Sequence, residues 1–116
     1  MTSEARLSLR LDLPGGRIGP GKIALLEAIA REGSISAAGR ALGMSYKRAW
    51  ELVDQLNTLF GQPVVAASIG GARGGGAKLT EAGLTLVAEY RAIERDAAEA
   101  CATRIESLLR RSRSGG

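Results

Sequence analysis

Four consecutive residues carry the side chains best suited to binding a partner rich in hydrogen-bond acceptors: Ser45, Tyr46, Lys47 and Arg48. All four donate hydrogen bonds, and the lysine and the arginine are also cationic. Such donors bind phosphate oxygens, and an arginine can donate two parallel hydrogen bonds to the acceptors on a guanine edge. This chemistry requires a rigid element that presents the four side chains together on an exposed surface.

A helix is predicted to begin directly after Ser45, whose hydroxyl can cap its first turn. Its buried face is predicted from apolar residues spaced three and four apart, namely Ala49, Leu52, Val53, Leu56 and Phe60. Lys47 falls on the opposite face, Tyr46 and Trp50 fall along one edge, and Arg48 falls along the other. The four donors therefore mark the N-terminal end of an amphipathic helix.

A shorter helix is predicted just before this one, between Ser34 and Gly43. Ser34 can cap its start, and Ile35, Ala38 and Leu42 recur at helical spacing. Gly43 is expected to end it, because glycine reaches left-handed backbone angles without a Cβ clash. Two short helices joined by a tight turn form a helix-turn-helix, in which the start of the second helix meets base edges in the DNA major groove.

A two-stranded hairpin is predicted after the second helix, with strands at Val64–Ala67 and Ala77–Leu79 joined by a glycine-rich loop. The glycines would let the backbone approach phosphates, and Arg73 near the tip could reach a phosphate or the minor groove. A hairpin loop that contacts nothing is the alternative. The loop lacks the lysine directly after the last glycine that a nucleotide-binding P-loop requires, so nucleotide binding is not expected.

Three segments resemble the DNA-binding domain of the ModE-type molybdate-responsive transcription regulators. They are GSIS at Gly33–Ser36, SYKRAW at Ser45–Trp50 and GARGGGAKLT at Gly71–Thr80. The helix-turn-helix half also resembles, more distantly, that of the LysR-type regulators. The resemblance covers Ile23–Thr80, and it implies a winged helix-turn-helix that binds double-stranded DNA.

The motif and the resemblance together define a set of residues that we expect to contact DNA. Lys47 and Arg48 would donate to base acceptors, and the other members would hold phosphate or sugar. Trp50, at the border of the apolar face, favours packing over base readout. The set is Ser34, Ser36, Ser45, Tyr46, Lys47, Arg48, Arg73 and Lys78.

The placement of charge supports this interpretation. The net charge is +4, and the segment Gly33–Lys78 alone carries five basic and two acidic residues, an excess of +3. An ordinary solvated surface could carry such an excess. Because the excess coincides with the motif, it favours a nucleic-acid partner.

The N-terminal region is predicted to hold one strand and one helix. Residues Arg6–Leu13 alternate strictly between leucine and polar residues, which indicates a half-buried strand. Such a strand needs a partner, and the candidates are the wing strands of this chain or those of a second copy. A helix is predicted at Lys22–Arg31, with an inner face of Ile23, Leu26, Ile29 and Ala30.

The last helix is predicted to begin after Thr80 and to continue unbroken to Arg111. Its apolar residues recur at steps of three and four beyond the point where its own domain could cover them, so we expect it to pack against the same helix of a second copy. A helix that folds back, or frays beyond Cys101, is the alternative. The expected dimer residues are Leu86, Tyr90, Ile93, Ala97, Cys101, Ile105 and Leu108.

Composition excludes several other classes of protein. The sequence has no histidine and one cysteine, so it cannot assemble the usual zinc ligands or an internal disulfide, and it shows no catalytic constellation. No apolar run approaches the ~20 residues that span a bilayer, and no signal peptide is visible, which favours a cytoplasmic protein. We therefore expect neither an enzyme nor a cofactor.

The predicted fold is mainly α with a small β wing, namely a winged helix-turn-helix plus a long C-terminal dimerisation helix. The expected boundaries are 1–80 for the DNA-binding domain, 81–111 for the dimerisation helix and 112–116 for a disordered tail. The molybdate-binding domains that the resemblance would imply do not fit in 116 residues, so we expect no small-molecule effector to bind this chain. A winged-helix protein-interaction module without DNA binding is the alternative function.

Overall fold

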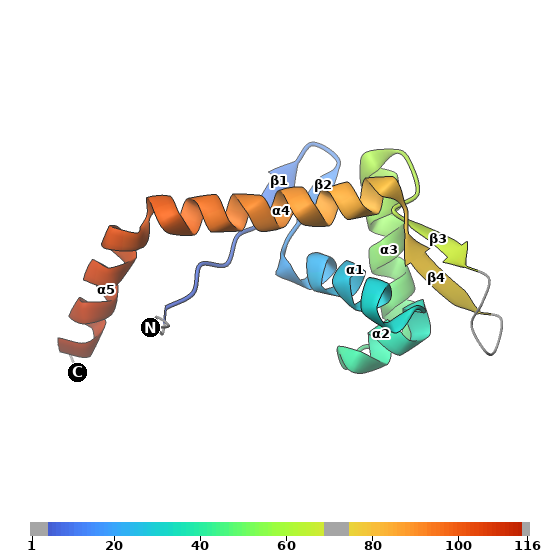
Figure 1. The fold of residues 1–116 in the computed structure, drawn as a ribbon, viewed down its shortest axis with the longest axis horizontal. Helices are drawn as coiled ribbons and strands as arrows, with labels where there is room; N and C mark the ends of the chain where they lie inside the picture. The colour runs from blue at the N-terminus through green and yellow to red at the C-terminus, as the bar shows by residue number, and fades with distance from the viewer. Residues whose placement is uncertain (1–4, 69–74, 115–116) are drawn as a thin grey trace.

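The computed structural model describes residues 5–68 and 75–114 and is elongated, with extents of 55 × 29 × 22 Å. Helices α1 to α3 form a compact body, which α4 crosses before it runs outward to α5 (Figure 1). This is the mainly α architecture that the sequence predicts. The elements are β1 (Leu11–Leu13), β2 (Gly16–Ile18), α1 (Pro20–Glu32), α2 (Ile35–Ala41), α3 (Tyr46–Phe60), β3 (Val65–Ser68), β4 (Gly76–Leu79), α4 (Glu81–Ala100) and α5 (Ala102–Ser114).

Helix α1 is the centre of the body because it is buried on two sides. Leu25 and Ala28 pack with α2 and α3, whereas Ile23 and Leu26 pack with residues of α3 and α4, and all four side chains are fully buried. The predicted inner face is therefore too narrow, and its member Ala30 is exposed. The prediction assumed a single apolar stripe, but a helix covered by neighbours on two sides has apolar residues on both of these faces.

Helices α2 and α3 approach each other closely at Gly39. A Cβ atom added there would lie 3.2 Å from the Met44 carbonyl oxygen and 3.4 Å from the Ala49 Cβ. The missing side chain thus allows the turn between the two helices to fold against α2. Gly43 adopts the left-handed conformation at φ 71°, as the sequence predicts.

Strands β3 and β4 form an antiparallel wing that is fastened to the body at both of its ends. The Ala77 N–H donates to the carbonyl of Gly33, between α1 and α2, over 2.8 Å. The Val64 N–H donates to the side-chain oxygen of Asn57 on α3, also over 2.8 Å. These bonds fix the wing beside the helix-turn-helix. The antiparallel pairing of β3 with β4, from Val65 opposite Leu79 to Ser68 opposite Gly76, confirms the hairpin that the sequence predicts there.

The predicted N-terminal strand is wrong in its length and in its partner. Only Leu11–Leu13 form a strand, and they pair with Gly16–Ile18 immediately after them. The turn at Pro14 and Gly15 reverses the direction of the chain. The segment directly after the turn therefore forms the hydrogen bonds that the strand needs, and a strand from elsewhere is not required. Residues 6–10 nevertheless keep the predicted alternation, with Leu7 and Leu9 half-buried and their neighbours exposed.

An ion-pair network fixes α4 across α1. The Arg91 guanidinium donates from Nη2 and Nε to both carboxylate oxygens of Glu27, over 2.6 and 2.9 Å, and from Nη1 to Glu94 over 2.6 Å. The hydrogen bond from Arg91 lowers the pKa of Glu27, and the two carboxylates raise the pKa of Arg91. A two-pronged contact of this kind sets the direction of a helix as well as its distance.

The prediction of one unbroken C-terminal helix is also wrong. Helix α4 ends at Ala100, Cys101 leaves the helical conformation at φ −103° and ψ 4°, and α5 begins at Ala102. Helix α5 continues to Ser114, so the expected tail is helical up to that residue, and residues 115–116 lie outside the described part. None of the helices in the described ranges is long and apolar enough to cross a membrane.

Candidate nucleic-acid interface

The first turn of α3 presents the four predicted donors on the surface. The Ser45 hydroxyl caps the helix by accepting from the Arg48 N–H over 3.0 Å. Ser45, Lys47 and Arg48 are exposed, and the Tyr46 side chain is 55% exposed. The opposite face is buried as predicted, through Ala49, Leu52, Val53 and Leu56.

The cations of this region carry their charge without local neutralisation. Arg10 and Arg31 each pair with a neighbouring acid, and Arg91 pairs with Glu27 and Glu94. Lys47 and Arg48 therefore form no ion pair within the described residues. Positive groups that are exposed and unpaired are available to an anionic partner.

One edge of α3 faces the wing across a groove of about 360 Å³. Tyr46, Trp50 and Asn57 line it from α3, and Ala66 and Ala67 line it from β3. Trp50 is 43% exposed, so the predicted packing role is wrong: its ring forms part of the groove wall rather than of the core. An exposed aromatic ring beside exposed cations is suited to contact a sugar or a base.

Helix α2 contributes two hydroxyl groups of the predicted set and one cation, Arg40, that the set omits. The Ser34 hydroxyl accepts from the Ala37 N–H over 3.0 Å and thereby caps α2, and Ser36 accepts from Arg40 over 2.9 Å. Both serines are half-buried, whereas Arg40 is exposed. Arg40 is four residues after Ser36 on a helix, and this spacing is the signal that would have found it.

The wing contributes Lys78, which is exposed on β4. The predicted contact Arg73 lies outside the described residues. Ala77 of β4 lines the groove together with Tyr46, whereas Lys78 does not line it, because successive side chains of a strand point to opposite faces. The groove thus brings the start of α3 beside the wing strands, and Lys78 lies on the exposed face of β4.

The sequence pattern of the bacterial regulatory helix-turn-helix proteins of the lysR family matches residues 21–84. The chain belongs to this family. The match spans α1 to α3, the wing and the start of α4, which is the unit that presents the donors. The β1–β2 hairpin precedes the matched residues.

Two groups of relatives agree with the resemblance to the ModE-type regulators. The molybdenum-pterin-binding protein MopB of Rhodobacter capsulatus is 50% identical over 98 residues, which cover 84% of this chain and 36% of that protein. The molybdenum transport protein ModE of Azotobacter vinelandii is 47% identical over 90 residues, which cover 78% of this chain and 33% of that protein. The chain thus spans about a third of the length of these relatives.

Solved structures confirm the winged helix-turn-helix fold. Full-length LysG of Corynebacterium glutamicum superposes with a TM-score of 0.56 at 31% identity, over 77% of this chain and 29% of that protein. The DNA-binding domain of CbnR, solved in complex with DNA, superposes with a TM-score of 0.59 at 20% identity, over 76% of this chain and 95% of that domain. At 20% identity, the similarity to the CbnR domain shows a shared fold alone.

Proposed function

We propose that this chain is the DNA-reading part of a transcription regulator that recognises a specific double-stranded sequence in the bacterial cytoplasm. The observation that carries the proposal is the first turn of α3, where an N-capped, rigid helix presents exposed and unpaired cationic donors beside a wing. A helix end of this kind fits the major groove, where base edges present their acceptors. Membership of the lysR family supports the same function.

The roles divide between reading bases and holding the backbone. Lys47 and Arg48 donate to base acceptors, because they stand one and two positions inside the helix start. Ser34, Ser36, Ser45, Tyr46 and Lys78 donate to phosphate or sugar oxygens, which fix the register without reading sequence. From the sequence alone, Arg73 belongs with this second group.

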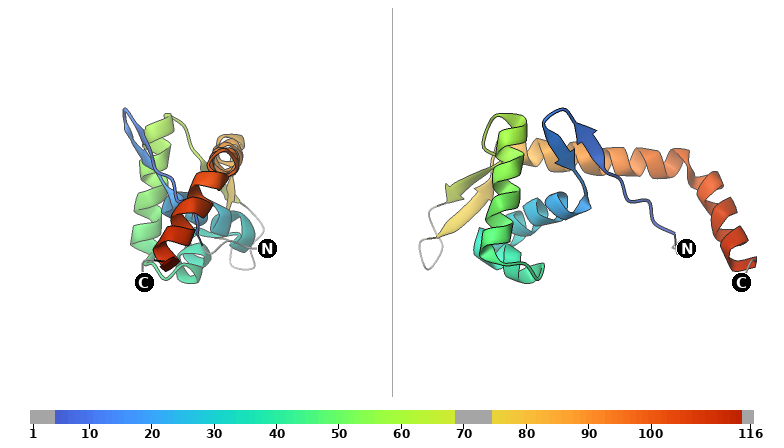
Figure 2. Two further views of the ribbon diagram at one scale, coloured as in Figure 1. Left: turned by 90° about the vertical axis from the view of Figure 1, so that its left-hand side faces the viewer. Right: turned by 180° about the vertical axis from the view of Figure 1, so that it is seen from behind.

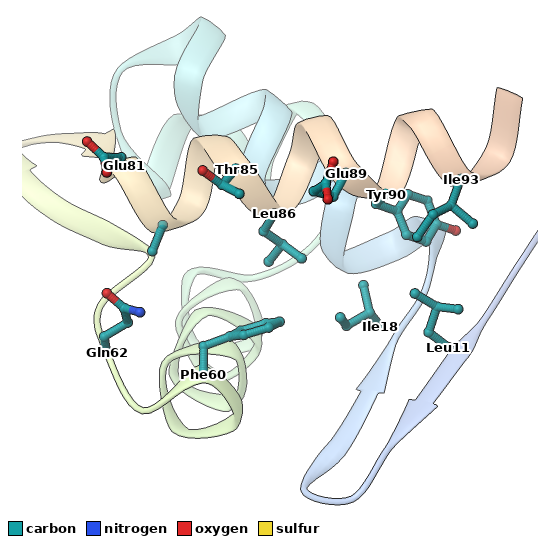
Figure 3. A pocket seen from close by; sticks show the side chains of 11 residues that line it. Leu11, Ile18, Phe60, Gln62, Glu81, Thr85, Leu86, Glu89, Tyr90 and Ile93 are labelled. Atoms are coloured by element: carbon teal, nitrogen blue, oxygen red, sulfur yellow. The ribbon is translucent and has the colours of Figure 1, made fainter. Parts of the chain in front are cut away.

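A homodimer is the proposed binding form, because the distal half of the molecule exposes apolar side chains. Ile93 is 40% exposed on α4, and Leu108 is 67% exposed on α5. An apolar groove of about 480 Å³ runs between α4, Phe60 and the β1–β2 hairpin, with Leu86 on its wall (Figure 3). A second copy that covers this surface would place two copies of α3 on a pseudo-palindromic site.

Two of the expected dimer residues have a role within the chain. Tyr90 is 1% exposed, and its hydroxyl donates to the carbonyl of Leu9 over 2.5 Å, so it serves the body rather than a partner. Leu86 is half-buried against the same core. Tyr90 therefore leaves the proposed dimer surface. That surface comprises the groove with Leu86 on its wall and, further along the helices, Ile93, Ala97, Cys101, Ile105 and Leu108.

The target genes that we propose are those of molybdenum handling, because relatives sharing about half of the aligned residues are named for molybdenum transport and molybdenum-pterin binding. Molybdate itself does not bind the 116 residues of this chain in our proposal. A ligand that binds the folded state raises its melting temperature. Added molybdate should therefore leave the melting temperature unchanged, and a reproducible rise would contradict this part.

Selection from random DNA duplexes tests the central proposal. Repeated rounds of binding at physiological salt should enrich one pseudo-palindrome, whose half-sites lie about 10 base pairs apart from centre to centre. The physical reason is that two symmetric copies of α3 must enter successive major grooves on one face of the duplex. Failure to enrich any sequence would favour a protein-interaction module instead.

A further inference from the structure

The hairpin β1–β2 lies on the flank of α3 opposite the β3–β4 wing. Seen from behind, α3 stands between the two hairpins (Figure 2). Contacts agree with this view: the groove on one edge of α3 is lined by β3 residues, and the groove on the other edge is lined by Gly15, Gly16 and Arg17. Helix α3, which carries the proposed DNA-reading residues, thus has a β-hairpin on each side.

Each face of β1–β2 has a different character. The cross-strand pair of Leu11 and Ile18 packs inward, with Ile18 only 3% exposed, whereas the next pair, Asp12 and Arg17, is exposed. The turn rests on the end of α3, where a Cβ added at Gly15 would lie 3.2 Å from Leu59 Cδ1. The hairpin is therefore fixed to the body, and it holds Arg17 outward at a defined place.

Cations gather between this hairpin and α3. A shallow groove of about 260 Å³ is lined by Arg10, Arg17, Lys22 and Arg48, among others. Arg10 pairs with Asp12 at 3.1 Å, but Arg17 and Arg48 form no ion pair anywhere in the described ranges. The Lys22 ammonium donates to the Arg17 carbonyl over 2.8 Å, which ties the first turn of α1 to the hairpin.

The electrostatics of this cluster favour an anionic partner. Burial lowers the pKa of Lys22, and the positive charges of Arg17 and Arg48 lower it further. Two acids stand against these four cations, namely Asp12, which pairs with Arg10, and Asp54, which lines the groove beside Arg17. The cluster therefore keeps an excess of two positive charges over the acids. An anion placed between the hairpin and α3 would relieve the repulsion that the fold imposes.

We propose that β1–β2 is a second wing, on which Arg17 and Lys22 hold a DNA phosphate at the flank of α3 opposite β3–β4. The inference rests on the proposed function, because it requires α3 to lie in a major groove. That groove is about 12 Å wide, and a phosphate backbone runs along each of its two walls. A helix in the groove with a hairpin on each flank can touch both walls, and the second wing then orients the protein without reading bases.

The test compares Arg17→Gln with a matched control, Arg95→Gln, which removes the same charge from an exposed position on α4. Affinity is measured over a range of salt concentrations, on the selected duplex and on an unrelated duplex. Arg17→Gln should weaken both by the same factor, roughly two- to fivefold, and should reduce the salt slope by about one unit per subunit. Arg95→Gln should behave as the wild type.

A third variant acts in the opposite direction and keeps the test decisive if Arg17→Gln folds poorly. Asp12→Asn removes the acid that stands across the ladder from Arg17, so it should tighten binding to both duplexes. Wild-type affinity and slope in both Arg17→Gln and Asp12→Asn would overturn the second wing. A loss confined to the selected duplex would also overturn it, because a phosphate contact carries no sequence preference. If the wild type itself binds no DNA, the proposed function fails rather than this inference.

Discussion

The body of the molecule and its distal arm have a similar spacing of apolar residues but differ in how far these residues are buried. The distal arm consists of α5 and the α4 residues beyond Tyr90. In the body, Ile23, Leu26 and Leu56 are fully buried, because neighbouring elements of the same chain cover them. Beyond Tyr90 no apolar side chain of the described residues is buried, and Leu108 is 67% exposed. The difference teaches that helical periodicity reports the need for a partner, whereas only the fold tells whether this chain supplies it.

Matched truncations of leucine should separate the two regions most strongly. Leu26→Ala removes a fully buried side chain between α1 and α4, and it should lower the free energy of unfolding by about 2–5 kcal/mol. Leu108→Ala removes an exposed side chain, and at concentrations where the protein is monomeric it should change stability by less than about 0.5 kcal/mol. Urea denaturation measures both changes, and equal losses would contradict the distinction.

Charging the arm should break the dimer and leave the body folded. Ile93→Asp places a carboxylate in the exposed apolar surface of α4, where a second copy would have to desolvate it. Sedimentation should show dimers of the wild type at micromolar concentration and monomers of the variant, with unchanged helical content. The control Glu99→Asp alters an exposed side chain of α4 and keeps its charge, so it should remain dimeric.

A wild-type protein that sediments as a monomer at that concentration would contradict the proposed dimer directly. The variant would then have no effect on assembly to measure. Binding to single half-sites would replace the pseudo-palindrome as the expected outcome of DNA selection.

The smallest effect that we predict concerns pH and the contact between α1 and α4. The lowered pKa of Glu27 means that its pairing with Arg91 stabilises the fold above about pH 4.5, and that this contribution is lost as the pH falls through the lowered value. Arg91→Met should therefore flatten the acid side of the stability profile. Because both side chains are 36% exposed, the change should stay below about 1 kcal/mol.

The matched control for this profile is Arg10→Met, since Arg10 and Asp12 form a more exposed pair at 3.1 Å and Arg10 does not act on the pKa of Glu27. Its acid profile should follow the wild type closely. An unchanged profile in Arg91→Met would mean that the Glu27 pair does not contribute to the placement of α4 on the body.

The parts of the fold that the sequence predicted well are those that local chemistry determines. Ser34, Ser45 and Thr80 each accept from the N–H three residues ahead, so a cap can be recognised within one turn of the chain. The apolar face of α3 and the left-handed Gly43 are equally local. The donors at the start of α3 could be found for the same reason.

The parts that it missed depend on contacts between distant segments. Tyr90 is buried because residues 81 positions earlier lie across α4, and periodicity carries no information about that neighbour. Trp50 is exposed because the wing stands away from its edge of α3 and leaves a groove. The bend at Cys101 contains neither proline nor glycine, the residues that usually mark a helix end in sequence.

The most direct test of the account compares specific with non-specific affinity in two variants of α3. Lys47→Ala and Arg48→Ala remove the donors assigned to base edges from exposed positions that carry no core contact. Each measurement is the ratio of affinities for the selected duplex and for an unrelated duplex at one salt concentration. Arg48→Ala should reduce the free-energy difference that corresponds to this ratio by about 1–3 kcal/mol. It should also relax the base preference at one position of each half-site. A ratio unchanged in both variants would show that α3 does not read the sequence, and the central assignment would fail.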